Sequence, residues 1–302
     1  MTTDYRAQVE RAIRYIVAHR SEPLPLRDVA RAAHLSEFHF HRIFSAVMGE
    51  TVGRFITRHR LETAALALAY ESKSITEVAL DAGYSSLSNF SKAFSAWFGV
   101  SPSAVRARLP AATDGIAKVT RGKVGELHPL PPEPSPEERA RLLTELGPVR
   151  FVERAAMPVA CLASPAGYDF TTLEATWDAM IRSVLELGIS DEAVDAYGMA
   201  YDSPQLTAPE LCRYHACVPC PANHPLPLPL FHGVIPEGRY AVFSYSGPTG
   251  EVERAYRTIY SLWFPSTKLA PDDYVAFEHY LNDAPIEGHI TYDIYIKVRP
   301  RT

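Results

Sequence analysis

One pattern is written twice in the first hundred residues of this chain, at residues 26–49 and 75–99. Residues up to Ser36 recur 49 positions later, whereas those from Arg42 to Gly49 recur 50 positions later. The second copy therefore contains one inserted residue. Because each copy has the apolar spacing of two short helices separated by a turn, this part of the chain is constrained to a helical fold with two equivalent subdomains.

Each copy is typical of a helix-turn-helix, in which a supporting helix precedes a helix that lies in the DNA major groove. The turn needs a residue that tolerates a positive φ, and we expect Gly83 to supply it in the second copy and His34 in the first. We expect Ser36 and Ser85 to cap the second helices. Two such units predict a monomer that reads two successive segments of the major groove.

The second copy also contains a longer series of specific residues. They are Gly83-Tyr84-Ser85, Phe90, Phe94, Phe98-Gly99 and Ser101-Pro102. On these residues, the stretch of about 5–108 resembles the AraC/XylS family of transcriptional regulators. The resemblance implies two helix-turn-helix subdomains joined by a long helix at about Thr51–Tyr70.

The second helix of each copy has an outward face that we expect to read bases. In the first copy these residues are Phe38, His41 and Arg42, opposite the core-facing Phe40, Ile43 and Phe44. Arg42 suits a bidentate contact with guanine, and Phe38 suits a thymine methyl group. The matching residues of the second copy are Leu87, Ser88, Asn89, Ser91 and Lys92. Since these are weaker hydrogen-bonding readers, we expect the second half-site to be read loosely, mainly by contact and DNA shape.

Four further basic residues are expected to contact the DNA backbone, which positions a protein without specifying sequence. They are Arg54, Arg58, Arg60 and Lys73. Charge is distributed accordingly, because residues 1–110 contain 14 Lys and Arg against 10 Asp and Glu, and residues 111–302 contain 16 against 25. A basic part joined to an acidic part suits a nucleic-acid module attached to one that does not touch nucleic acid.

A length of 302 residues predicts about two domains. We expect a DNA-binding domain at 1–110, a Pro-stiffened linker at 111–147 with a short helix after Pro136, and a second domain at 148–302. No apolar run is long enough to span a bilayer and the N-terminus is polar, so we expect a cytoplasmic protein. Four unevenly spaced cysteines do not make a disulfide scaffold.

The second domain contains its own repeat, with a period of 80 residues. Residues 159–163 pair with 239–243, and residues 196–204 resemble 276–285. Each half has the pattern strand, helix, strand, strand. The chain is therefore predicted to be multidomain, an all-α part followed by an α+β domain of duplicated units with an antiparallel sheet and a pseudo-twofold axis.

Residues 148–300 also resemble the GyrI-like, or bacterial effector-binding, domain. The resemblance is carried by Gly167-Tyr168, Trp177, Tyr201-Asp202-Ser203-Pro204, Gly238-Arg239-Tyr240, Trp263-Phe264-Pro265, Phe277-Glu278-His279-Tyr280 and Asp293-Ile294-Tyr295-Ile296. It implies that Glu278 lies in an aromatic pocket and meets cationic ligands.

Strand alternation places Glu278 and Tyr280 on one face, and the 80-residue repeat makes Gly198 the counterpart of Glu278. We expect that glycine to leave room for a ligand. A carboxylate among aromatic rings suits a small cationic, planar effector. The candidate wall residues are Tyr168, Trp177, Tyr201, Tyr245, Tyr256, Trp263 and Tyr280.

Other functions stay open at this point. Some GyrI-like domains hydrolyse reactive small molecules, so Glu278 could be a general base, or the acidic half could be a ligand-free module that docks another protein. The residues Cys212, His215, Cys217, Cys220 and His224 could form a metal or redox site, although no second paired-ligand motif accompanies them. No cofactor is expected, because no Gly-rich phosphate loop is present. We expect ligand binding to shift either a domain arrangement or a contact with RNA polymerase.

Overall fold

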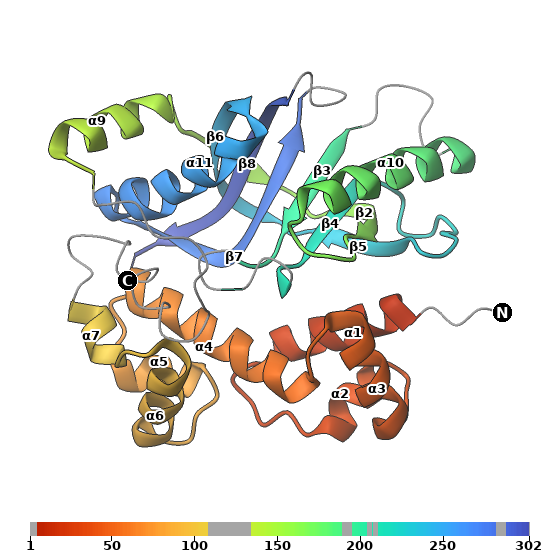
Figure 1. The fold of residues 1–302 in the computed structure, drawn as a ribbon, viewed down its shortest axis with the longest axis horizontal. Helices are drawn as coiled ribbons and strands as arrows, with labels where there is room; N and C mark the ends of the chain where they lie inside the picture. Colours follow the sequence, from red (N-terminus) through yellow and green to blue (C-terminus); the bar gives the residue numbers. More distant parts are fainter. Residues whose placement is uncertain are drawn as a thin grey trace. The chain divides into compact units, whose positions relative to one another are not determined.

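A computed structural model describes residues 5–107, 134–188, 195–203, 207, 211–281 and 288–301. The chain divides into two compact units, a helical one and one built on a sheet (Figure 1). The predicted fold is confirmed at this level: a helical N-terminal region precedes an antiparallel sheet with helices. Among the described helices, none is long and apolar enough to cross a membrane.

The helical unit contains two short helix pairs and a long helix that runs between them (Figure 1). Its elements are α1 (Tyr5–Ala18), α2 (Leu26–Ala32), α3 (Glu37–Met48), α4 (Val52–Tyr70), α5 (Ile75–Asp81), α6 (Leu87–Phe98) and α7 (Pro102–Ala107). The long helix expected at Thr51–Tyr70 is thus confirmed, with Thr51 as its N-cap.

The two turns have the predicted geometry. His34 adopts a φ of 56° and Gly83 a φ of 74°. Ser36 caps α3 by accepting a hydrogen bond from the amide of His39, as expected. The prediction for the second copy is wrong by one residue, because Ser86 caps α6 and Ser85 does not. The inserted residue lies in the turn before the cap, so α6 begins 50 positions after α3 whereas α5 begins 49 positions after α2.

Aromatic residues form the core of both helix pairs. Phe40 and Phe44 of α3 are fully buried, and Phe44 packs edge-on against Phe55 of α4 at 5.5 Å between ring centroids. Phe90 and Phe94 occupy the equivalent positions on α6 and are equally buried. The core-facing side of each second helix is therefore as predicted, which leaves the opposite side exposed.

The second unit is an eight-stranded antiparallel sheet with helices. Its elements are α9 (Pro136–Glu145), β1 (Arg150–Arg154), β2 (Met157–Ala163), α10 (Phe170–Leu187), β3 (Ala196–Ala200), β4 (Tyr214–Pro219), β5 (Phe231–Ile235), β6 (Gly238–Pro248), α11 (Val252–Thr258), a π-helical turn (Ile259–Trp263), β7 (Leu269–Tyr280) and β8 (His289–Pro300). The short helix expected after Pro136 is confirmed as α9. The rest of the predicted linker, up to residue 133, lies outside the described residues.

The strands are ordered β1-β6-β8-β7-β3-β4-β2-β5. The central pair is β7 and β3, and its register sets Gly198 directly opposite Glu278. Helices α10 and α11 pack on one face of the sheet, α10 over β2 and β4 and α11 over β6 (Figure 1). Because side chains alternate along a strand, Glu278 and Tyr280 share that helix-covered face.

Candidate functional site

The first recognition helix, α3, presents large side chains to solvent. Phe38 is 76 % exposed, and the guanidinium of Arg42, one turn further on, lies 5.8 Å from the centre of its ring. His41 is also exposed. The three residues predicted to read bases therefore lie on the outward face of α3, where the aromatic ring supports the arginine by a cation–π contact.

The second recognition helix, α6, presents smaller groups. Leu87 is 42 % exposed, Ser88, Asn89 and Lys92 are exposed, and Ser91 is half-buried. Asn89 also donates its backbone amide to the Ser86 cap. The geometry is compatible with the predicted reading face, and DNA contact by these residues stays a prediction.

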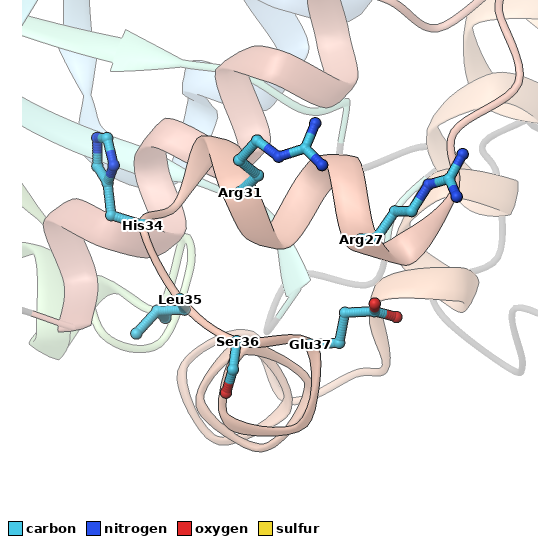
Figure 2. Close-up of a pocket in the computed structure, with 6 residues that line it drawn as sticks. All are labelled: Arg27, Arg31, His34, Leu35, Ser36 and Glu37. Atoms are coloured by element: carbon cyan, nitrogen blue, oxygen red, sulfur yellow. The ribbon is translucent and has the colours of Figure 1, made fainter.

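A shallow depression lies beside the first turn, between α2 and the start of α3 (Figure 2). The side chains of Arg27 and Arg31, one turn apart on α2, are 69 % and 79 % exposed. Figure 2 shows both arginines projecting from α2, with Ser36 and Glu37 at the start of α3 below them. Sequence reasoning missed these cations. Their spacing of four residues was a signal that they share one helix face.

The residues expected to contact the DNA backbone are largely engaged within the protein. Arg58 is 2 % exposed, and its guanidinium pairs with Glu50 at 2.7 Å and with Glu62 at 3.1 Å, so the prediction for Arg58 is wrong. The reason is that Arg58 lies on the buried side of α4. Lys73 is held by Glu71 at 3.0 Å and Asp81 at 2.7 Å.

Arg60 is also engaged, because it donates to two backbone carbonyls, those of Arg20 and Glu22. Arg54 has a side chain that is 65 % exposed, and it is the member of the predicted set that best retains access to a phosphate.

The sheet unit contains a buried carboxylate, that of Glu278 on β7, which is 7 % exposed. The hydroxyl of Tyr256 on α11 donates to Oε1 at 2.8 Å, and that of Tyr280 donates to Oε2 at 3.0 Å. Among the described residues no other group hydrogen-bonds to this carboxylate, and no Lys, Arg or His pairs with it. The charge of this carboxylate is therefore not compensated by a cation, and a carboxylate without such a partner is costly to bury.

A chain of donors ends on Glu278. The indole N–H of Trp177 on α10 can only donate, and it donates to the Tyr214 hydroxyl at 3.2 Å. The Tyr214 and Tyr280 oxygens are 2.8 Å apart. Since Tyr280 donates its proton to Glu278, Tyr214 must donate to Tyr280. The order Trp177, Tyr214, Tyr280, Glu278 therefore links α10 to the carboxylate, as Tyr256 links α11 to it.

Burial dominates the ionisation of this site. It raises the pKa of Glu278 from 4.5 to about 7, and the hydrogen bonds from Tyr256 and Tyr280 oppose the shift. Burial likewise raises the pKa of both tyrosines well above the ordinary value, so both stay hydroxyl donors. Around neutral pH the site therefore contains a carboxylate that gains or loses a proton easily.

Gly198 has a different role from the one expected. A Cβ at this position would lie 2.2 Å from the Tyr214 hydroxyl oxygen and 2.9 Å from Oε2 of Glu278. The space next to the glycine is thus taken by Tyr214, and the room predicted there for a ligand is not present. The glycine is required because Tyr214 approaches the backbone so closely.

The structure brings four of the predicted ligand residues together. They are Glu278, Tyr280, Trp177 and Tyr168, with Tyr256 of the candidate wall as a fifth. Tyr168 packs edge-on against Tyr214 and donates its hydroxyl to the Asp202 carbonyl at 2.6 Å.

Two members of the cluster were missed by sequence reasoning, Tyr214 and Tyr292. Tyr292 pairs with Tyr280 across β7 and β8, and its ring centroid lies 5.5 Å from that of Tyr280. Its buried hydroxyl has no hydrogen-bond partner among the described residues. Strand alternation was a usable signal for both residues, but only once the strand pairing was known.

Three predicted wall residues lie elsewhere. Tyr201 packs on His215, whose side chain lies on the opposite face of the sheet from Tyr214, so this prediction is wrong. Trp263 packs against Phe243, Phe264 and Phe151 in a separate aromatic group. Tyr245 lies at the margin, where its ring contacts Tyr292 and its hydroxyl donates to the carbonyl of Pro248.

All four cysteines are buried, and two of them, Cys161 and Cys217, lie in strands of the sheet. The sulfurs of Cys161 and Cys217, directly paired on β2 and β4, are 3.3 Å apart and both residues are fully buried. Within the part of the chain that the structure describes, no group of three or more His, Cys, Asp or Glu residues is arranged to hold a metal ion. The arrangement gives no support to a metal site at Cys212, Cys217 and Cys220.

Comparison with known proteins now bears on both sites. Residues 147–299 match the family model of the GyrI-like small molecule binding domain, and residues 29–108 match a helix-turn-helix domain. This chain belongs to the GyrI-like family. Its N-terminal module is an AraC-type DNA-binding domain. The protein thus combines a DNA-binding helix-turn-helix domain with a small-molecule-binding domain.

The relatives resemble this GyrI-like protein in its N-terminal part. The regulatory protein SoxS of Escherichia coli (strain K12) is 34 % identical over 101 residues, which are 33 % of this chain and 94 % of SoxS. The regulatory protein PocR of Salmonella typhimurium is 33 % identical over 107 residues, 35 % of each chain, so the match spans about a third of PocR. A solved AraC-type transcriptional regulator from Chromobacterium violaceum is 28 % identical, with a TM-score of 0.33, and the match covers 34 % of this chain and 92 % of that one.

Proposed function

We propose that this protein is a cytoplasmic transcription regulator that reads promoter DNA with α3 and α6 and responds to a small cationic, aromatic molecule bound at Glu278. Residues 1–110 and 148–302 would act as separate domains joined by 111–147. The observation that supports the ligand assignment best is the uncompensated carboxylate of Glu278, buried among aromatic rings.

A cationic ligand would supply the charge that the protein leaves out. A carboxylate accepts about four hydrogen bonds, and two are taken by Tyr256 and Tyr280, so each oxygen can still receive a donor. Aromatic ring faces attract cations, and the rings of Trp177 and Tyr280, with centroids 5.0 Å apart, lie beside the carboxylate. The buried Tyr292 hydroxyl beside them offers a further polar contact.

Binding of two isosteric probes to the full chain tests this proposal. Calorimetry would compare N-methylquinolinium, a planar cation, with neutral 1-methylnaphthalene. Glu278→Gln keeps the shape and removes the charge, so we expect a loss of about 30-fold or more for the cation. The neutral probe should lose much less. Glu174→Gln, an exposed carboxylate on α10, is the matched control. An equal loss for both probes would contradict charge pairing.

The same site should bind the cation in a pH-dependent way. The cation requires ionised Glu278, and its presence lowers the pKa of that carboxyl below its ligand-free value of about 7. Affinity should therefore be nearly flat above pH 7 and fall by up to about tenfold per pH unit below it, because protons compete with the cation. Glu278→Gln should remove this dependence, and a profile that persists in the variant would assign it to another group.

A hydrolase is the second candidate function, favoured by the same raised pKa. A carboxylate with a pKa near 7 is suited to activate water at neutral pH. Product release from a bound compound, lost in Glu278→Gln, would support an enzyme. Stoichiometric binding without turnover would support the regulator.

We further propose that the sheet consists of two copies of one unit, β2-α10-β3-β4 and β6-α11-β7-β8, related by a pseudo-twofold axis. The strand order supports this proposal. From the central pair outward, β7 is followed by β8 and β6, and β3 is followed by their counterparts β4 and β2. Each copy would contribute one helix to the Glu278 site. Ligand binding would then shift either the domain arrangement or a contact with RNA polymerase, through its different affinity for two states.

A further inference from the structure

Three segments of the helical unit meet at Arg60, in the middle of α4. Its Nε donates to the carbonyl of Arg20 at 2.8 Å, and its Nη2 donates to the carbonyl of Glu22 at 2.5 Å. Both carbonyls belong to the connection between α1 and α2. One guanidinium on α4 therefore holds the segment that enters the first helix-turn-helix.

The third segment is the turn of the second helix-turn-helix, at Gly83. A Cβ on Gly83 would lie 2.7 Å from the Arg20 carbonyl oxygen and 2.9 Å from both Cζ and Nη2 of Arg60. The backbone of the second turn thus rests directly on the guanidinium and on the carbonyl that it binds. Arg60 and Gly83 join the two helix-turn-helix units at a point other than the ends of α4.

Comparison with the first turn shows that a glycine is required at position 83 by the contact with Arg60, in addition to the geometry of the turn. His34 occupies the matching position with a φ of 56°, so an ordinary residue is accommodated in this conformation. Its side chain is exposed. At Gly83 the φ is 74°, and in addition no space is left for a side chain. The residue is determined by the close approach of the two units.

We propose that Arg60 is a positioning residue, which through Gly83 fixes the separation and rotation of the recognition helices and so restricts the protein to one spacing between its two DNA half-sites. The proposal rests on the DNA-reading role of α3 and α6. A single helix such as α4 fixes its two ends but leaves each attached unit some freedom to rotate about its junction. A second contact beside the helix removes that freedom.

The consequence for DNA is geometric. Each base pair inserted between two half-sites moves them apart by about 3.4 Å and rotates them by roughly a tenth of a turn. A rigid reader cannot follow this change and must release one half-site, whereas a reader whose two units can turn retains part of both contacts. Spacing tolerance is therefore the property that separates a positioning role for Arg60 from a purely stabilising one.

The test uses the full-length protein and a DNA duplex enriched from a random library by that protein. One or two base pairs are inserted or removed between the half-sites, and affinities are measured by mobility shift at constant salt. The native protein should lose about 30-fold or more on a one-base-pair insertion, the equivalent of one or two mismatched base pairs. Arg60→Met should bind the parent duplex within a few-fold of the native protein but lose only about 3-fold on the insertion.

Two further variants separate the effect of the two hydrogen bonds of Arg60 from the effect of its positive charge. Arg60→Lys keeps the charge but cannot bind two carbonyls with one planar fork, so it should relax the spacing as Arg60→Met does. Arg14→Met, which removes an exposed arginine of α1, should retain the native spacing profile. A full spacing penalty in both Arg60 variants would overturn the proposal, as would a loss that is equal at every spacing.

Replacing Arg60 could unfold the helical unit, so a further variant leaves Arg60 in place. Gly83→Ala forces the same contact apart, and if thermal denaturation shows it folded, it should also tolerate the insertion. An unchanged spacing penalty in folded Gly83→Ala would likewise overturn the proposal. Failure to enrich any duplex is a different outcome, because it would contradict the DNA-reading role of α3 and α6 itself.

Discussion

The two helix-turn-helix units share one motif but are attached to α4 by different means. After the first, the chain passes through Glu50, whose buried carboxylate pairs with Arg58 of α4. Fifty residues later the matching position is Val100, which has no charge. The second unit instead contacts Arg60 of α4 through the bare backbone of Gly83.

The two units also differ in the side chains that their recognition helices expose. The first presents Phe38 and Arg42, and the second presents Ser88 and Lys92 at the matching positions. We infer that the first unit carries most of the sequence discrimination and that the second mainly contributes affinity at a fixed distance. A duplicated motif thus need not mean two equal readers.

The largest expected effect concerns the charged attachment of the first unit. Arg58→Met would leave the carboxylates of Glu50 and Glu62 buried without their cation, and we expect it to destabilise the helical unit by about 3–5 kcal/mol. Urea denaturation followed by the fluorescence of Trp97, in a background where Trp177 and Trp263 are replaced by phenylalanine, would measure the change. Arg27→Met, at an exposed position on α2, is the control and should cost less than about 0.5 kcal/mol. A loss of under 1 kcal/mol for Arg58→Met would show that the ion pairs do not hold the first unit.

That attachment could not be predicted from the sequence. An arginine on an amphipathic helix reads as a solvent-exposed cation, and Arg58 was accordingly expected to meet DNA. Its burial depends on Glu50, eight residues earlier and just before α4, and on Glu62, one turn later. Sequence spacing does not show which face of α4 is covered. The two turns were predictable, because a positive φ narrows the choice of residue at His34 and Gly83 to a few types.

The same limit applies to the ligand site. Glu278 and Tyr280 were predictable, because strand alternation is a local rule and a resemblance points to the carboxylate. Tyr214 and Tyr292 lie on other strands, so their placement depends on the pairing register. Tyr201 has the right residue type but the wrong face of the sheet, which composition alone does not reveal.

The next effect concerns the difference between the two reading faces. Arg42→Ala should weaken binding to a selected duplex by about 1–3 kcal/mol and relax base preference at one position, since a planar guanidinium makes two directed bonds to guanine. Lys92→Ala should cost less than about 1 kcal/mol, weaken all sequences alike, and reduce the salt dependence of binding by about one ion. Equal losses of specificity in the two variants would show that both units read sequence equally.

The smallest effect tests where the inserted residue of the second unit lies. Ser36 and Ser86 both accept a hydrogen bond from the backbone amide three residues later, at 3.4 and 3.2 Å, so replacing either by alanine should destabilise the helical unit by about 1 kcal/mol. Ser85→Ala should change stability by less than about 0.5 kcal/mol, because Ser85 lies in the exposed turn before the cap. The three variants are compared by the same urea denaturation.

A larger loss of stability for Ser85→Ala than for Ser86→Ala would place the insertion after the cap, inside α6. Because each residue advances an α-helix by about 100°, the reading face of α6 would then be rotated by that angle relative to the reading face of α3. Leu87, Ser88 and Lys92 would then no longer be the counterparts of the residues exposed on the first unit, so this modest change in stability decides whether the two faces can be compared position by position.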